Sequence, residues 1–121
     1  MSATGLSADP AEYQRRLQEQ SDEQIDAWAT ELLRDMSIRQ GVLPVLAEVR
    51  HATHLDDAAL RSAFTAGGGA AATVGRTTDG RMMVPAISLR FLVPGIRRTY
   101  ADARDKLIAY LVASFEELVY I

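Results

Sequence analysis

The sequence contains no cysteine, and this absence excludes disulfide bonds, thiolate metal sites and thiol nucleophiles together. It also suits a reducing compartment. The first residues, from Met1 to Ser7, have neither the basic start nor the continuous apolar segment of a signal peptide. We therefore expect a cytoplasmic protein.

A long apolar run is missing as well. The stretch 107–115 is apolar at every position except Ser114, but it has roughly half of the ~20 residues that a bilayer span needs. We therefore predict no membrane partner. The stretch instead predicts a buried C-terminal helix over residues 100–120, with Thr99 as its N-cap. A helix with apolar residues on all sides is covered by other elements on more than one face.

Lysine is almost absent, since Lys106 is the one exception among thirteen basic residues. The first sixty residues hold eleven acids and five bases, and the remainder hold five acids and eight bases. The planar guanidinium of arginine binds carboxylate and phosphate well. We therefore predict an anion-binding set on or just after the hairpin described below, made of Arg76, Arg81, Arg90, Arg97 and Arg98. The alternative is that acids of the N-terminal half neutralise these arginines within the fold.

Helix signals dominate the N-terminal half. Asp9 before Pro10, Ser21 with Gln24 three residues later, and Asp56 each mark a helix start. The second helix has the clearest apolar face, and we predict that all of this face lies in the core: Ile25, Trp28, Ala29, Leu32, Leu33 and Met36. Four short helices are expected before residue 67.

The spacing of apolar residues changes from a helical to an alternating pattern after the three glycines at 67–69. We interpret these glycines as a flexible connection. Asp79-Gly80 is a strong hairpin signal. After it, alternate residues are apolar, which predicts a long second strand: Met83, Pro85, Ile87, Leu89, Phe91 and Val93. Because proline lacks an amide, we expect a bulge near Gly75 or a longer loop. Pro94-Gly95 is interpreted as a turn.

These elements predict an α+β fold. It has four short N-terminal helices, a β-hairpin with a long second strand, and a long buried C-terminal helix. Residues 1–8 are expected to be a flexible tail, and residues 9–121 a single α+β domain.

One candidate metal site is present. Glu48 and His51 have the Glu-x-x-His spacing that places a carboxylate and an imidazole on one side of a helix. Only one copy of the motif occurs, so a metal would need a second chain, and a solvated polar face is the simpler interpretation. Gly67 to Ala72 matches a dinucleotide-binding pattern but follows a helix instead of a strand. We expect no cofactor.

The function that these features favour is a small cytoplasmic interaction or accessory module, without catalysis of its own and acting as a homo-oligomer. It would bind an acidic protein partner or an anionic ligand through the hairpin arginines. An unpaired second strand would supply the oligomer contact through Ile87, Leu89, Phe91 and Val93.

Two alternatives remain open. The first is a winged-helix-like DNA-binding regulator, with residues 73–92 as the wing. Its recognition helix would begin with acids, which repel phosphate. The second is a small-ligand-binding protein or enzyme with a pocket between the hairpin and the helices.

Overall fold

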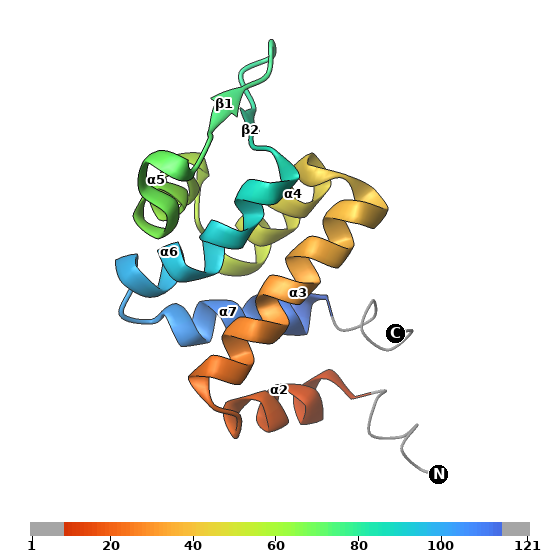
Figure 1. The fold of residues 1–121 in the computed structure, drawn as a ribbon. Coiled ribbons are helices and arrows are strands. Elements are labelled where there is room, and N and C mark those ends of the chain that lie inside the picture. The colour runs from red at the N-terminus through yellow and green to blue at the C-terminus, as the bar shows by residue number, and fades with distance from the viewer. Residues whose placement is uncertain (1–8, 115–121) are drawn as a thin grey trace.

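The computed structural model describes residues 9–114, which form a mostly helical fold with a small hairpin projecting from one end (Figure 1). The elements follow one another as α2 (Pro10–Gln18), α3 (Asp22–Gln40), α4 (Val42–Thr53), α5 (Asp57–Gly68), the 3₁₀ segment η1 (Gly69–Ala71), β1 (Gly75–Arg76), β2 (Met82–Met83), the 3₁₀ segment η2 (Ala86–Phe91), α6 (Leu92–Thr99) and α7 (Ala103–Ala113). The predicted α+β class is therefore wrong. The predicted tail over residues 1–8, and the predicted helix beyond residue 114, lie outside the described residues.

The N-terminal helices begin where the sequence predicts, because their caps are local. The Asp9 carboxylate accepts a hydrogen bond from the Ala11 amide at 3.0 Å. The Ser21 hydroxyl accepts from the Gln24 amide at 3.1 Å, and the Asp56 carboxylate accepts from the amide three residues on at 2.8 Å. Each contact satisfies a backbone donor that the first helical turn cannot pair internally.

The buried face of α3 is confirmed except at Trp28. Ile25, Ala29, Leu32, Leu33 and Met36 are buried, whereas Trp28 is 37% exposed. At 100° per residue, Trp28 lies about 90° around the helix from the centre of the buried stripe. The tryptophan therefore flanks the core and does not belong to it.

The predicted long second strand is wrong, since η2 and α6 occupy its place. Residues 83–93 alternate, but Leu89, Leu92, Val93 and Ile96 also have helical i, i+3, i+4, i+7 spacing, and each is at most 2% exposed. Ile87 would share a strand face with Leu89, yet it is 69% exposed. The apolar residues thus fit both periods, and tertiary packing selects the helical one.

The hairpin itself is present but short. Gly75 pairs with Met83 and Arg76 with Met82. The Thr77 amide then donates to the Arg81 carbonyl oxygen at 2.7 Å, which leaves residues 78–80 as the loop. Gly80 has φ = 88°, which glycine adopts without steric cost. The loop is one residue longer than the Asp79-Gly80 turn, which is one of the two outcomes expected from Pro85. That proline lies beyond the last paired residue.

The helices α5 and α6 touch backbone to backbone at two glycines. A Cβ on Gly95 would lie 1.6 Å from the Ala63 carbonyl oxygen, and a Cβ on Gly67 would lie 2.0 Å from the Phe91 carbonyl oxygen. The interpretations of residues 67–69 as a flexible connection and of Pro94-Gly95 as a turn are therefore wrong. Gly67 and Gly68 end α5, Gly95 lies within α6, and Pro94 is tolerated in the first turn of α6.

Helix α7 lies at the centre of the core and contacts α2, α3, α4 and α6. Coverage on more than one face is thus confirmed. Leu107, Ile108, Tyr110 and Leu111 are buried along it. The helix begins later than predicted, because Thr99 still belongs to α6 and a turn precedes α7. No helix in the described part of the chain is both long and apolar enough to cross a membrane.

Candidate functional site

A groove of about 830 Å³ lies between α3 and the segment formed by η2 and α6. We call it the α3–α6 groove. Both walls are on the same face of the molecule, where α3 runs beside η2 and α6 (Figure 1). One wall comes from residues 23–34 and the other from residues 86–98. Its position depends on the helical conformation of residues 86–98, which the sequence alone did not reveal.

The α3 wall is a single stripe next to the buried face of that helix. Its members are spaced by three or four residues: Glu23, Asp26, Ala27, Thr30, Glu31 and Arg34. The middle of the stripe carries small side chains, Ala27 and Thr30, and the ends carry charges. Small residues in the middle leave room between the walls.

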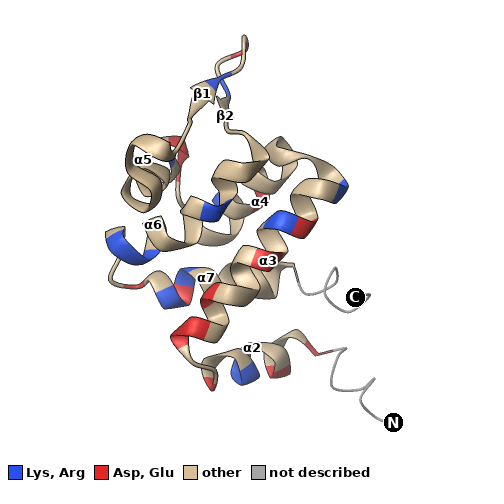
Figure 2. Cartoon of the chain, viewed as in Figure 1, with Lys and Arg blue, Asp and Glu red and all other residues tan. Residues whose placement is uncertain are grey.

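The opposite wall is apolar at its base and basic along its edge. Leu89 and Val93 are buried beneath it, and Ile87 is largely exposed at its rim. The basic members are Arg90, Arg97 and Arg98. Figure 2 shows acidic positions toward the start of α3 and basic positions on η2 and at the end of α6. The η2–α6 wall is therefore basic, and the α3 wall is net acidic, because its one base, Arg34, is paired with Asp35 at 3.3 Å.

An ion-pair network closes one end of the α3–α6 groove. Arg97 bridges the walls with a nitrogen 2.8 Å from the Asp26 carboxylate and 3.4 Å from that of Asp22. A guanidinium nitrogen of Arg104 also lies 2.7 Å from the Asp22 carboxylate. The hydrogen bond from Arg104, together with the charge of Arg97, lowers the pKa of Asp22 below its usual value. Arg104 further donates to the Gln18 and Gln20 carbonyl oxygens, so it ties α2 to α7.

This network predicts a loss of stability in acid. The pKa of Asp22 is lower in the folded chain than in the unfolded chain, where an aspartate has a pKa of about 3.9. Its contribution is therefore complete above about pH 5 and is lost as pH falls through the folded-state pKa. We expect Asp22→Asn to lose less thermal stability between pH 7 and pH 3 than the wild type. Melting curves that shift equally in both proteins would contradict this expectation.

The five predicted anion-binding arginines do not form one set. Arg76 and Arg81 are on the hairpin, where they contact the Gly80 carbonyl oxygen and the Asp79 carboxylate at 2.9 and 3.0 Å. Arg90, Arg97 and Arg98 line the α3–α6 groove.

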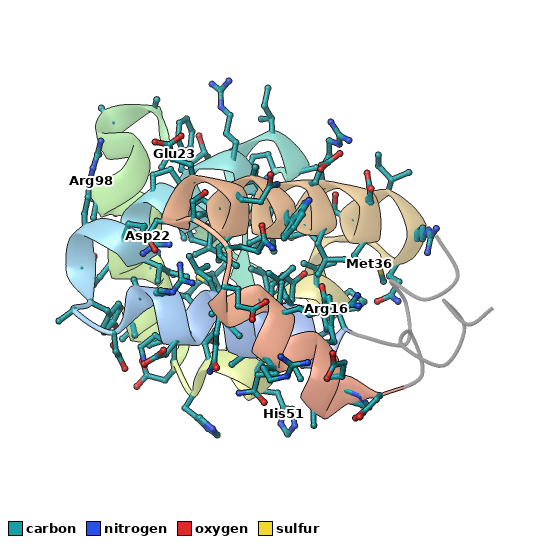
Figure 3. The ribbon with its side chains drawn as sticks, turned by 90° about the horizontal axis from the view of Figure 1, so that it is seen from below. Arg16, Asp22, Glu23, Met36, His51 and Arg98 are labelled. Atoms are coloured by element: carbon teal, nitrogen blue, oxygen red, sulfur yellow. The ribbon has the colours of Figure 1, made fainter. Side chains whose placement is uncertain are left out.

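The three groove arginines differ in their partners. Arg97 is held by its two aspartates, as described above. Arg98 donates to the Ala66 carbonyl oxygen at 2.8 Å and lies against α5 (Figure 3). Arg90 lies 4.7 Å over the Phe91 ring. Within residues 9–114, neither Arg90 nor Arg98 has a carboxylate partner.

The predicted oligomer contact is largely inaccessible. Leu89 and Val93 are each 2% exposed, and Phe91 is partly buried against the glycines of α5. Ile87 is the exposed member of the four. Pairing of open strand edges between two copies is therefore not available here, and the oligomeric state stays a prediction.

Glu48 and His51 lie in different surroundings. Glu48 lines a second, smaller hollow of about 260 Å³ together with the buried Tyr110. Burial first, and the Glu48 carboxylate second, raise the pKa of Tyr110. His51 is exposed at the edge of the molecule away from Glu23 (Figure 3). Among residues 9–114, no group of three or more histidine, aspartate or glutamate side chains is placed to hold a metal ion.

Comparison with protein-family models, with curated proteins and with solved structures finds no match for this chain. The α3–α6 groove is thus interpreted from its own geometry and charge.

Proposed function

We propose that the protein is a small interaction module that binds a partner polypeptide in the α3–α6 groove. The observation that carries this proposal is the composition of the groove: an apolar base between α3 and η2–α6, with charged side chains along its edges. An apolar centre surrounded by a polar rim is the usual anatomy of a protein interface. The highly exposed Ile87 at the rim supplies apolar surface that a partner would cover.

The cytoplasm is the proposed location, on the basis of the cysteine-free composition. Homo-oligomer formation is a further part of the proposal. Because the predicted strand contact is absent, its support is exposed apolar surface, in particular Ile38 on α3, which is 77% exposed and lies outside the groove lining.

The geometry offers less support to the two alternatives. The fully exposed side of α5 carries Ala58, Ser62 and Thr65, and the one base of that helix, Arg61, is half-buried, so α5 offers a DNA phosphate little charge. A small ligand is favoured by one observation, since about 830 Å³ falls within the usual size range of small-molecule sites. However, Glu23 and Glu31 face the arginines across the groove, so a purely anionic ligand would meet repulsion on one side.

Filling the groove tests the proposal. Ala27 is exposed in the middle of the α3 wall, so Ala27→Trp should occupy the space without disturbing the core. We expect the wild type to capture a partner from the native cell extract and Ala27→Trp to lose it by roughly tenfold or more.

The matched control is Ala47→Trp, which adds the same side chain at an exposed position of α4 outside the groove. It should capture the partner as the wild type does, and circular dichroism should show both variants folded. Equal capture by all three proteins would place the binding surface elsewhere and contradict the proposal.

A further inference from the structure

We infer that the occupant of the α3–α6 groove is an amphipathic α-helix of about three turns, with basic residues along one edge and acidic residues along the other. This inference rests on the proposed function. Three features of the groove carry it: the conformation of its walls, its length and its distribution of charge.

The walls determine the backbone of the occupant. Residues 23–34 and 86–98 are helical apart from the helix junctions, so their backbone groups are paired within their own segments. An extended peptide needs an open strand edge to satisfy its amides and carbonyls, as in strand addition to a sheet. Such an edge is absent from the groove lining. A helix satisfies its own backbone and can lie on an apolar surface.

The length of the groove determines the size of the occupant. From Glu23 to Arg34 the α3 wall advances eleven residues, which corresponds to about 16 Å along the helix axis, or three turns. Helices pack with axes about 8 to 10 Å apart, depending on the size of the side chains at the contact. Ala27 on one wall and Ala86 with Pro94 on the other are small enough for such an approach.

The charges determine the edges of the occupant. Glu23 and Glu31 on the α3 wall form no ion pair with any described residue. Across the groove, Arg90 and Arg98 likewise have no carboxylate partner among residues 9–114. A helix that carries lysine or arginine toward α3, and glutamate or aspartate toward η2–α6, would neutralise both sets. A uniformly charged partner would meet repulsion from one wall.

A second copy of the same chain fits less well through this face. Two copies related by a two-fold axis would present groove to groove, and two concave surfaces leave a hollow between them. The convex surface of a single helix fills the groove directly.

A displayed library of helical peptides tests the inference. Each peptide has about fourteen residues, with apolar residues varied at i, i+3, i+4 and i+7, and with lysine, glutamate or glutamine varied at both edges. The library is selected against the full chain and, in parallel, against Ala27→Trp. We expect enrichment on the wild type alone, of peptides with lysine on one edge and glutamate on the other. Lysine on either edge, with glutamate on the other, supports the inference, because the peptide helix can lie in the groove in two opposite directions.

Binding of one enriched peptide then identifies the contacts that select it. Replacing Glu23 and Glu31 together, as Glu23→Gln with Glu31→Gln, should weaken that peptide by roughly tenfold at low salt. The same peptide should bind more weakly to the wild type at about 0.5 M salt.

Three outcomes would overturn the inference. Enriched peptides with acids on both edges would indicate an anion-binding groove, and edges without charge preference would remove the role of the two walls. An absence of enrichment on the wild type would reject a helical occupant. In each case the proposed interaction module survives if Ala27→Trp still loses the captured cellular partner, and it fails separately if that loss is not seen.

Discussion

Replacing Gly95 with alanine is expected to lower the free energy of unfolding by about 3 kcal/mol, the upper end of what overpacking usually costs. A Cβ at this position would lie 1.6 Å from the Ala63 carbonyl oxygen and 2.4 Å from its carbonyl carbon. Both atoms are backbone, so no side-chain rotation relieves the clash. The helices α5 and α6 would have to move apart, which opens the core next to Phe64 and Ile96. Thermal melting of the purified variant is the direct measurement.

An increase in stability is also physically possible for Gly95→Ala, so the measurement separates a crowded glycine from an uncrowded one. Alanine is the better helix former by about 1 kcal/mol. If position 95 were not crowded, Gly95→Ala would therefore stabilise α6 and raise the free energy of unfolding. A variant that melts at or above the wild-type temperature would mean that the two helices are not in backbone contact. Gly75→Ala is the matched control, because its Cβ would lie 3.9 Å from its nearest neighbour, the Met83 carbonyl oxygen. Its stability should stay within about 0.5 kcal/mol of the wild type.

Truncating Leu111 to alanine should cost roughly 2 to 5 kcal/mol, as is usual for a large-to-small change in a packed core. Leu111 is 1% exposed on α7, and this helix contacts α2, α3, α4 and α6. Neighbours on several sides cannot all collapse into the space that the leucine leaves. Urea unfolding measures the effect as a lower midpoint with an unchanged slope.

Val112→Ala provides the comparison for Leu111→Ala. Val112 is adjacent on the same helix but only partly buried, and fewer atoms are removed. It should cost about 1 kcal/mol or less. If the two substitutions have equal effects, α7 is not the centre of the core.

Sequence predicted the parts of the fold that local chemistry determines. The cap at Ser21 and the end of α3 at Gly41 depend on residues within a few positions of each other. Burial of Leu32 and Leu33 follows from spacing alone. These features need no knowledge of the remaining chain.

Features that depend on tertiary contacts could not be predicted from the local sequence. The segment after Pro85 satisfies both the strand and the helix period, and only the burial of Leu92 and Ile96 distinguishes them. The role of Gly67 and Gly95 depends on which backbone each one meets. A glycine can serve either a flexible or strained backbone or the close approach of another backbone. The sequence alone does not distinguish these two roles, and the first was predicted.

The α3–α6 groove could have been found only in part. Ala27 and Thr30 recur at helical spacing between Glu23 and Glu31, and this row of small residues flanked by acids was visible in the sequence. The opposite wall was assigned to a strand, which put Ile87 and Val93 on one surface and concealed the pairing of the two walls. Prediction of the arginines as a group failed for the same reason, because helix geometry places Arg90 and Arg98 beside the groove and leaves Arg76 and Arg81 on the hairpin.

The attachment of α2 also bears on the order in which the chain can fold during its synthesis. Helix α2 is made before the other described helices, yet Arg104, which donates to the Gln18 and Gln20 carbonyl oxygens, follows more than eighty residues later. Its buried Leu17 lies against a core that includes α7. The contact between α5 and α6 joins segments about thirty residues apart, so loop closure delays it far less. Among the described helices, α2 leaves the ribosome first, but its contacts with α7 can form only once α7 has left the exit tunnel.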